Sequence, residues 1–350
     1  MDGMEMKEMT SLERVMRALE LQEVDRPPVI PQLTYAAGYY INMGIDKALT
    51  DFKKQEKALL NAQKLGGYDG IYAGWEGSFV LVTSSFRGVE LKTYPDKPPA
   101  ISKPLITSKE ELDKLPEFDP LSQGRIPLNL KLIKSLKSKV KTIPILSYVP
   151  SPFTLGSLFL GVNEFMIALM RDKLKILDAL LQRTYQITLK FALAKIEAGA
   201  DMISIADPSG SSDMVSPKLF EQHSLPLLKD LVSELKTKGK KVGLHICGQT
   251  KPILLKMAET GADYLEIDSK VDLKEAQEIL KGEVCLMGNI STADLGNQSS
   301  EEIKKQAEVL VENMQPGFIL SSGCEVPYST PIENIQAMVQ VAQKFKQMQS

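Results

Sequence analysis

The sequence predicts an α/β fold, a single (β/α)8 TIM barrel that spans residues 1–350. Eight short runs of β-branched or aliphatic residues alternate with longer stretches in which apolar residues recur three and four positions apart, as in repeated strand–helix units with a parallel sheet. No linker-like segment divides the chain, and α/β barrels of this length form one domain. An open doubly wound sheet is the alternative, but no Gly-x-Gly-x-x-Gly motif follows the first predicted strand, so a dinucleotide site has no support.

The eight predicted strands are residues 28–33, 68–74, 143–149, 201–206, 241–246, 263–268, 284–287 and 317–321. The clearest predicted helices are residues 47–65, 174–198 and 217–238. Glycine follows each of these three helices, which is the expected stop for a helix. Ser216 and Pro217 also form an N-cap followed by proline at the first helical position.

Two regions do not fit the strand–helix repeat. Residues 1–26 form a predicted N-terminal helical extension, which we expect to cap the lower end of the barrel. Residues 78–104 form a predicted insertion after the second strand, with a β-hairpin of strands 79–86 and 89–94 around Arg87 and Gly88. A proline-rich stretch follows this hairpin.

Composition narrows the class of protein. The 42 Lys and Arg residues nearly balance 44 Asp and Glu residues, so no nucleic-acid partner is expected. Three cysteines do not make a disulfide framework, and the first ten residues lack the apolar core of a signal peptide. No stretch reaches the ~20 apolar residues of a membrane span. The sequence therefore predicts a cytoplasmic protein without a membrane partner.

His245, Cys247 and Cys324 are the candidate metal ligands. The first two lie two positions apart at the end of the fifth predicted strand, and Cys324 lies just past the eighth. In a barrel these positions share the catalytic rim, and three nitrogen and sulfur ligands leave one zinc position open for a substrate. The alternative is a satisfied core histidine and two buried cysteines. Cys285 lies inside an apolar strand and is expected to be core.

Several segments of the chain together resemble one superfamily. They are residues 149–155 (Val-Pro-Ser-Pro-Phe-Thr-Leu), 199–208, 244–248 (Leu-His-Ile-Cys-Gly), 286–290 (Leu-Met-Gly-Asn-Ile), and 322–324 with 330–334. From about residue 10 to 346 the chain resembles the uroporphyrinogen decarboxylase superfamily. It is most similar to the branch of zinc-dependent corrinoid methyltransferases that includes the methylcobamide:coenzyme M methyltransferases.

The decarboxylase branch differs from this chain in one motif. That branch carries Arg-Gln-Ala-Gly-Arg near its N-terminus, where the arginines bind substrate carboxylates. Residues 31–40 here read Pro-Gln-Leu-Thr-Tyr-Ala-Ala-Gly-Tyr-Tyr, and residues 27–46 contain no Arg or Lys. A tetrapyrrole with many carboxylates needs cationic partners, so uroporphyrinogen decarboxylase activity is a lesser alternative.

The resemblance and the rim positions together give five further candidates. Asp207, Asp268 and Asn289 are the candidate catalytic residues. Asp207 either lines the pocket or caps the following turn. Asp268, or Glu266 on the same strand, would be a fourth zinc ligand or would accept a hydrogen bond from the ring N–H of His245. The alternative for Asp268 is a carboxylate that caps the next helix. Asn289 is a candidate for substrate contact.

Two residues are candidates for cofactor binding at the same rim. Tyr148 either faces the corrinoid or is a buried tyrosine with a satisfied hydroxyl. Glu325 is expected at the rim beside Cys324, where it would contact the substrate or the corrinoid.

The resemblance implies methyl transfer between a corrinoid (cobalamin) and a small-molecule thiol such as coenzyme M. A zinc-bound thiolate would attack the methyl carbon of methyl-cobalt(III). The chain lacks the Asp-x-His-x-x-Gly motif that ligates cobalamin, and its other histidine, His223, lies within a predicted helix, so a separate corrinoid protein is expected. The alternatives are transfer from a methoxylated aromatic or another methyl donor to cobalt(I), and a docking module without turnover.

Two sets of residues bear on the methyl donor or acceptor. An aryl ether would need aromatic walls, which Tyr72, Trp75, Phe79 and Tyr148 offer. A thiol sulfonate would need a cation, for which the insertion offers Arg87, Lys92, Lys97 and Lys103.

Overall fold

The computed structural model describes residues 8–171, 174–313 and 316–349, so residues 1–7 of the predicted extension lie outside the described part. The strands are β1 (Ile71–Tyr72), β2 (Leu91–Lys92), β3 (Ala100–Ile101), β4 (Ile145–Pro150), β5 (Met202–Ala206), β6 (Lys241–Ile246), β7 (Tyr264–Ile267), β8 (Cys285–Ile290) and β9 (Phe318–Ser322). The α-helices are α1 (Ser11–Leu19), α2 (Phe52–Gly66), α3 (Ser78–Thr83), α4 (Lys109–Asp113), α5 (Ile126–Lys139), α6 (Pro152–Leu160), α7 (Val162–Met170), α8 (Leu174–Ala198), α9 (Pro217–Leu219), α10 (Leu225–Lys236), α11 (Leu254–Ala258), α12 (Leu273–Ile279), α13 (Thr292–Asn297), α14 (Ser300–Asn313) and α15 (Ile332–Gln349). Short 3-10 helices cover Tyr35–Ile41, Ile45–Ala48, Pro208–Gly210 and Lys251–Ile253, and a π-helical turn covers Phe220–Ser224.

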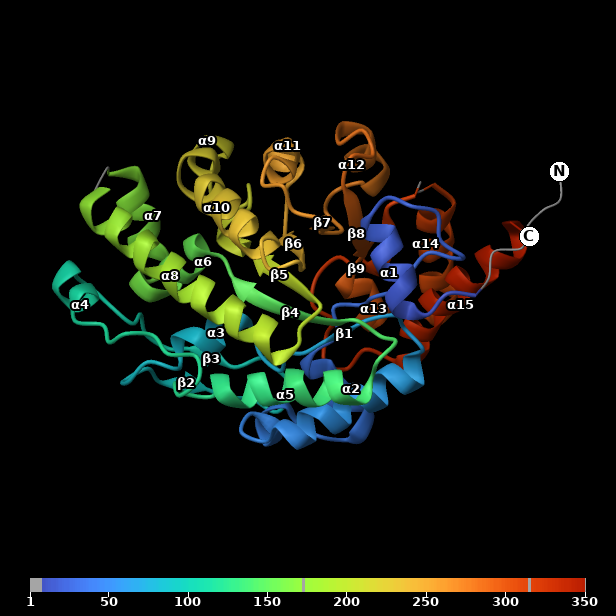
Figure 1. The fold of residues 1–350 in the computed structure, drawn as a ribbon, viewed down its shortest axis with the longest axis horizontal. Helices are drawn as coiled ribbons and strands as arrows, with labels where there is room; N and C mark the ends of the chain where they lie inside the picture. Colours follow the sequence, from blue (N-terminus) through green and yellow to red (C-terminus); the bar gives the residue numbers. More distant parts are fainter. Residues whose placement is uncertain (1–7, 172–173, 314–315, 350) are drawn as a thin grey trace.

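Seven parallel strands form the central sheet, in the order β1-β4-β5-β6-β7-β8-β9. Figure 1 shows these strands in the middle of the molecule with the helices around them. Between the two edge strands lies the segment 28–30: Ile30 N donates to Leu320 O of β9 at 2.9 Å, and Asp69 N, just before β1, donates to Val29 O at 2.7 Å. The predicted α/β barrel is therefore confirmed. The first predicted strand, residues 28–33, is reduced to a single bridge between Val29 and Leu320, because Pro28 and Pro31 cannot donate to a ladder.

The interior of the barrel at the amino ends of the strands is apolar. Leu146, Met202, Cys285 and Ile319 point inward there and are fully buried, as expected for Cys285. The apolar face of α1, with Val15, Ala18 and Leu19, packs against the same cluster. Residues of the N-terminal extension therefore close this end of the barrel, and the opposite end is left for a site.

Ion pairs tie α1 to the barrel at this closed end. Arg14 lies 2.6 Å from Asp25 and 2.8 Å from Asp69, and its side chain is only 3% exposed. Arg26 lies 2.8 Å from Asp69 as well. Because each buried charge has an opposite partner, removing one of them would leave uncompensated charge in the interior.

The insertion after β1 differs from its prediction. Residues 78–83, expected to be part of a hairpin strand, form helix α3, and the antiparallel pair joins β2 to β3 with Leu91 opposite Ile101. The run Val80-Leu81-Val82 is apolar at every position and fully or nearly buried, so its periodicity does not separate a strand from a buried helix. The hairpin is present within residues 78–104, and β2 lies inside the predicted strand 89–94, but its partner is β3 and the predicted strand 79–86 was wrong.

Helix α6 begins immediately after β4. The Ser151 side chain caps it by accepting from Thr154 N, and Pro152 stands at its first position.

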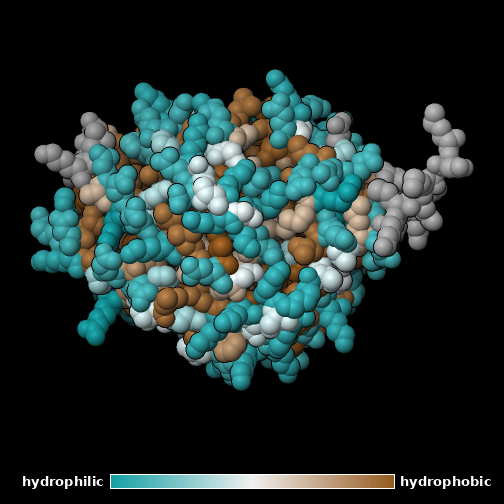
Figure 2. All heavy atoms as spheres, in the orientation of Figure 1, coloured by the Kyte–Doolittle hydropathy of each residue, from teal (hydrophilic) through white to brown (hydrophobic). Residues whose placement is uncertain are grey.

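Within residues 8–171, 174–313 and 316–349, no single helix is long and apolar enough to cross a membrane. The helices α6 and α7 meet the length and hydropathy criteria only when taken together, and the chain bends by 109° between them. On the face in Figure 2, hydrophilic side chains predominate and the apolar areas are small and separate.

Candidate metal centre

The three predicted metal ligands come from the ends of β6 and β9. His245 points into the barrel from β6, and Cys247 follows the last residue of that strand. Gly248 then turns the chain with φ +87°, and its N–H donates to Asp268 Oδ2 at 2.8 Å. Cys324 follows Gly323, where an added Cβ would lie 2.6 Å from Ser269 N. Glycine is therefore needed for the loop carrying Cys324 to pass so close to the loop after β7.

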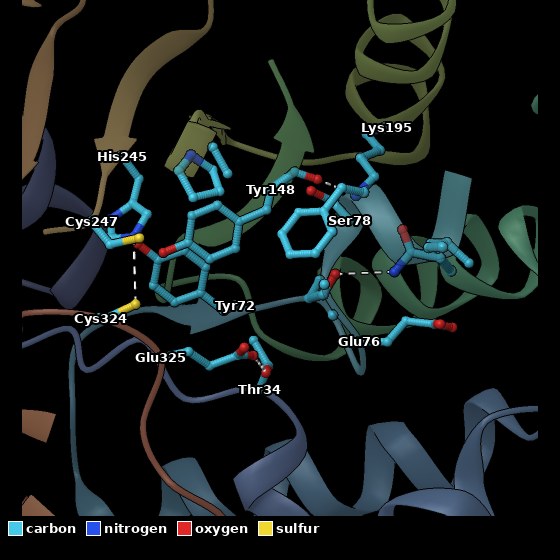
Figure 3. A pocket seen from close by; sticks show the side chains of 18 residues that line it. Thr34, Tyr72, Glu76, Ser78, Tyr148, Lys195, His245, Cys247, Cys324 and Glu325 are labelled. Atoms are coloured by element: carbon cyan, nitrogen blue, oxygen red, sulfur yellow. Dashed lines mark hydrogen bonds between the residues drawn. The ribbon is translucent and has the colours of Figure 1, made fainter. Parts of the chain in front are cut away.

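The structure brings these three side chains together. Their ligand atoms all lie within 4.8 Å of one another, and Cys324 Sγ lies 3.7 Å from His245 Nε2 (Figure 3). Metal–ligand bonds of about 2.3 Å to sulfur and about 2.0 Å to nitrogen place neighbouring tetrahedral ligands about 3.5 Å apart. The observed distance between sulfur and nitrogen is close to that edge. The donor set fits three corners of a tetrahedral metal site.

The electrostatics of the three ligands favour a cation. The contact with Cys324 lowers the pKa of Cys247, and the same contact, with burial, raises the pKa of Cys324. Burial works against protonation of His245, but its contacts with Cys324 and Glu266 raise its pKa to about 10. Negative charge is therefore concentrated around the imidazole, where a dication would displace the remaining protons.

Glu266 lies behind His245, in the centre of the barrel. Its carboxylate is fully buried and accepts hydrogen bonds from Tyr72 at 2.9 Å, from Tyr148 at 2.7 Å and from Ser204. Its Oε2 lies 3.3 Å from His245 Nδ1, the ring nitrogen that faces away from the sulfur atoms. Burial would raise the pKa of Glu266, but His245 and the hydroxyl donors lower it below its usual value. A carboxylate behind a ligating imidazole fixes the orientation of its ring.

A pocket of about 180 Å³ opens beside the three ligands. The rings of Tyr72 and Tyr148 stack in parallel with centroids 4.7 Å apart, and both line the pocket together with Phe79. The Tyr148 hydroxyl donates to Glu266, as expected for a buried tyrosine with a satisfied hydroxyl, and the residue also lines the pocket. Contact of Tyr148 with a corrinoid stays a prediction. Trp75 donates to Ile45 O and does not line the pocket.

Glu325 lies on the pocket wall, as predicted. It accepts a hydrogen bond from the Thr34 hydroxyl, and burial raises its pKa to about 7. Contact of Glu325 with a substrate or a corrinoid stays a prediction.

The three predicted catalytic residues have structural partners instead of pocket positions. Asp207 is fully buried and accepts from Ser151, from Thr154 at 2.7 Å and from Ser224 at 2.6 Å. These hydroxyls oppose the burial that raises its pKa. Its side chain makes no cap hydrogen bond to the following turn and is not among the residues that line the pocket, and a catalytic role of Asp207 stays a prediction. Asn289 Nδ2 donates to the carbonyl oxygens of Asp268 and Val271 at 3.0 and 2.7 Å and is not at the pocket surface.

Asp268 holds the turns on either side of it. Its carboxylate accepts from Gly248 N and from Lys270 N at 2.9 Å, and it is not one of the three clustered ligands. It lies near enough to Cys247 to oppose ionisation of that thiol. A direct role in chemistry stays a prediction, and Glu266 is the residue whose carboxylate lies beside His245.

Sequence reasoning missed the polar residues at the other end of the pocket. Lys195 of α8 and Ser78 of α3 line it, as does Glu76, which forms a two-point ion pair with Arg125 at 3.0 and 2.6 Å. Lys195 carried a detectable signal, because a lysine within the apolar run 191–196 lies on the face that α8 buries. The predicted cations Arg87, Lys92, Lys97 and Lys103 are all exposed and do not line the pocket.

Comparisons with known proteins agree with this architecture. A family model for uroporphyrinogen decarboxylase (URO-D) matches residues 10–345. A methylcobamide:CoM methyltransferase from Methanosarcina acetivorans is 29% identical over 353 residues, 97% of this chain and 100% of that protein. A uroporphyrinogen decarboxylase from Coxiella burnetii is 25% identical, covering 95% of both chains. A solved methyltransferase from Methanosarcina mazei superposes with a TM-score of 0.88 at 27% identity, covering 97% of this chain and 99% of that one. The resemblance read from the sequence is confirmed, and this chain belongs to the uroporphyrinogen decarboxylase family.

Proposed function

We propose that this protein is a corrinoid-dependent methyltransferase that moves a methyl group from a methylated corrinoid to a small thiol of the coenzyme M type. The observation that carries the proposal is the convergence of His245, Cys247 and Cys324 at one end of a pocket. The similarity to methylcobamide:CoM methyltransferases along nearly the whole chain supports the same conclusion.

Zinc is the metal that best suits this donor set. One imidazole and two thiolates are borderline-soft ligands, and together they balance the charge of a dication. When bound, zinc would supply the positive charge that keeps an acceptor thiol deprotonated near neutral pH. Glu266 supports this role, since it would hold His245 with Nε2 directed at the ion.

The proposed transfer is a displacement at the methyl carbon. The acceptor thiol loses its proton to solvent, and a lone pair of its sulfur forms the new bond to carbon. The carbon–cobalt bond breaks with its electron pair left on cobalt, which changes from cobalt(III) to cobalt(I), and the product is a methyl thioether. The walls formed by Tyr72 and Tyr148 would keep water away from the sulfur during this step.

The size of the pocket supports a corrinoid that arrives on another protein. The pocket beside the three ligands has a volume of about 180 Å³. Such a space suits a small acceptor, whereas a corrin ring would have to approach from the mouth. A separate corrinoid protein would therefore dock over the carboxyl ends of the strands.

A second candidate is the opposite direction of transfer, from a methoxylated aromatic to cobalt(I). The aromatic walls Tyr72, Phe79 and Tyr148 favour this alternative. Uroporphyrinogen decarboxylation is less favoured, because Lys195 is the one lysine or arginine among the residues that line the described pocket and the substrate carries many carboxylates.

The test combines metal analysis with a transfer assay. We expect about one zinc per chain, and loss of zinc in Cys247→Ala and in Cys324→Ala, while the matched thiol variant Cys285→Ala retains it. The zinc-loaded protein should convert methylcobalamin to cob(I)alamin when 2-mercaptoethanesulfonate is added, as followed by absorbance under anaerobic conditions. Full zinc content in either ligand variant would rule out the site. Demethylation of methoxyarenes by cob(I)alamin, without transfer to any thiol, would establish the second candidate.

A further inference from the structure

Lys195 is a buried cation without a carboxylate partner. Its side chain extends from α8 toward the pocket and is 2% exposed. Its Nζ forms no ion pair with any acidic group in the described residues, and burial alone lowers its pKa to about 7. An unpaired ammonium in such surroundings is unfavourable, so an anion at this position would stabilise it.

The hydrogen bonds of Lys195 leave one donor free. Its Nζ donates to Ser147 Oγ at 3.0 Å and to Tyr148 O at 2.6 Å. An ammonium group carries three N–H donors, so the third remains for a group in the pocket. Nζ also lies over the ring of Phe191, 4.1 Å from its centroid, in a cation–π contact that supplies no anionic partner.

Ser78 is a second polar group of the pocket that can bind an anion. Ser78 is only 5% exposed, lines the pocket, and its hydroxyl has no hydrogen-bond partner. The two acidic residues of the pocket are already engaged, Glu76 by Arg125 and Glu325 by Thr34. Ser78 is thus a second buried donor that lacks an acceptor, independent of the charge on Lys195.

Lys195 and Ser78 lie at the end of the pocket away from the metal ligands. Figure 3 draws both on the side opposite Cys247 and Cys324, with the rings of Tyr72 and Tyr148 between the two ends. A molecule that spans the pocket would therefore have a sulfur at one end and an acceptor of hydrogen bonds, preferably an anion, at the other.

We propose that Lys195 is the specificity-determining residue for the acceptor, binding with Ser78 an anionic group at the end of the molecule opposite its thiol. This proposal rests on the proposed function, because it assigns the second end of the same acceptor. It favours a sulfonate or carboxylate thiol over a neutral thiol of equal length. Burial of the ammonium away from water is unfavourable. An anion would offset this free-energy cost through a charge-assisted hydrogen bond, whereas a neutral hydroxyl would offset less of it.

The experiment compares acceptors that share a 2-mercaptoethyl group and differ in the terminal group, which is anionic in two of them and neutral in the third. Wild type and Lys195→Met are loaded with zinc and assayed with methylcobalamin and either 2-mercaptoethanesulfonate, 3-mercaptopropionate or 2-mercaptoethanol. We expect Lys195→Met to raise KM for the two anionic thiols by roughly 10- to 100-fold and to leave KM for 2-mercaptoethanol nearly unchanged. The two anionic thiols distinguish a sulfonate from a carboxylate. Ethanesulfonate, which has no thiol, should inhibit wild type competitively and Lys195→Met much more weakly.

Two further variants keep the result interpretable. Lys190→Met, on the same helix but exposed and paired with Glu117, is the matched control and should behave as wild type. If Lys195→Met does not fold, Ser78→Ala decides, since it removes an unpartnered hydroxyl and should raise KM for the anionic thiols roughly threefold to tenfold. Equal changes for charged and neutral thiols, or none, would overturn the role of Lys195 and leave the methyltransferase proposal intact. A wild-type protein that methylates no thiol would instead overturn the proposed function.

Discussion

Replacing Glu266 with Gln should weaken zinc binding by roughly 10- to 100-fold while leaving the fold intact. Loss of a carboxylate partner behind a ligating histidine typically costs this much in metal affinity. In free energy the change is about 1.4 to 2.7 kcal/mol, at about 1.4 kcal/mol for each factor of ten. Glu266 qualifies for this effect because its Oε2 lies 3.3 Å from His245 Nδ1 and the carboxylate is fully buried.

Glutamine is chosen because it preserves the volume and one acceptor oxygen. The hydroxyls of Tyr72, Tyr148 and Ser204 all donate to Glu266 in the wild type, and they can rotate to accept from the new amide. Alanine would remove the carboxylate that three buried hydroxyls share and leave the Tyr148 hydroxyl without its acceptor, at about 1–3 kcal/mol, while Ser204 would keep its hydrogen bond to Tyr264 at 2.6 Å. The loss of fold stability would then be hard to separate from the loss of zinc affinity.

The assay is competition for zinc against a chromophoric chelator at neutral pH. The control is Glu283→Gln, the same substitution at an exposed glutamate. Urea unfolding of the metal-free protein is measured in parallel. The pKa of Glu266 is lowered from 4.5, so its charged form stabilises the native state above about that pH, and this contribution is lost as the pH falls through the folded value. A zinc affinity equal to wild type in a folded Glu266→Gln protein would refute the reasoning that this carboxylate acts through His245.

Three other substitutions are predicted to change the stability of the fold, and one of them is also predicted to change zinc binding. Arg14→Met should destabilise the protein by about 3–5 kcal/mol in urea unfolding, because it leaves Asp25 and Asp69 with less buried countercharge, and zinc stoichiometry should not change. Gly248→Ala should cost at least about 1–2 kcal/mol through its positive φ, and more because the added Cβ would lie 2.7 Å from Ser211 Oγ and nearer still to Asp213 Oδ2. It should also weaken zinc binding measured by chelator competition, because it shifts the neighbouring Cys247. Asp207→Ala should destabilise the fold more than Asp207→Asn, while both bind zinc as wild type does; a selective loss of zinc in either would return Asp207 to the site.

The barrel could be predicted because most of its strands carry their own signal. The strands β4 to β6 are runs of β-branched or aliphatic residues whose two faces are both covered, and the glycines after α2 and α8 mark where those helices end. Segment 28–30 and α3 could not be assigned from local pattern. Segment 28–30 is recognised only from its backbone contact with β9, which depends on the tertiary fold. Helix α3 contains a buried apolar run whose pattern suits a helix as well as a strand.

The metal cluster was predictable for a different reason from the rest of the site. His245, Cys247 and Cys324 are rare residue types, and parallel strands bring their carboxyl ends to one rim. Carboxylates and amides are common residue types, and at the rim they can bind backbone groups of a loop instead of a substrate. Asn289 is an example, because its side chain donates to the backbone carbonyl oxygens of Asp268 and Val271. Lys195 could not be predicted from the rule that functional residues follow the carboxyl ends of strands, because it reaches the pocket from helix α8.

Tyr148 tests whether the metal end and the pocket wall are one unit. Its hydroxyl donates to Glu266 at 2.7 Å, while its ring stacks on Tyr72 and lines the pocket. Tyr148→Phe removes only the first of these contacts, so we expect zinc affinity to fall by less than tenfold, a smaller loss than in Glu266→Gln, because two hydroxyl donors to Glu266 remain. KM for the thiol acceptor at saturating zinc should stay within about twofold of wild type, because the ring surface is unchanged. The opposite result, a higher KM with unaltered zinc affinity, would mean that this hydroxyl turns to the acceptor during the reaction and that the link from the pocket wall through Glu266 to His245 does not operate.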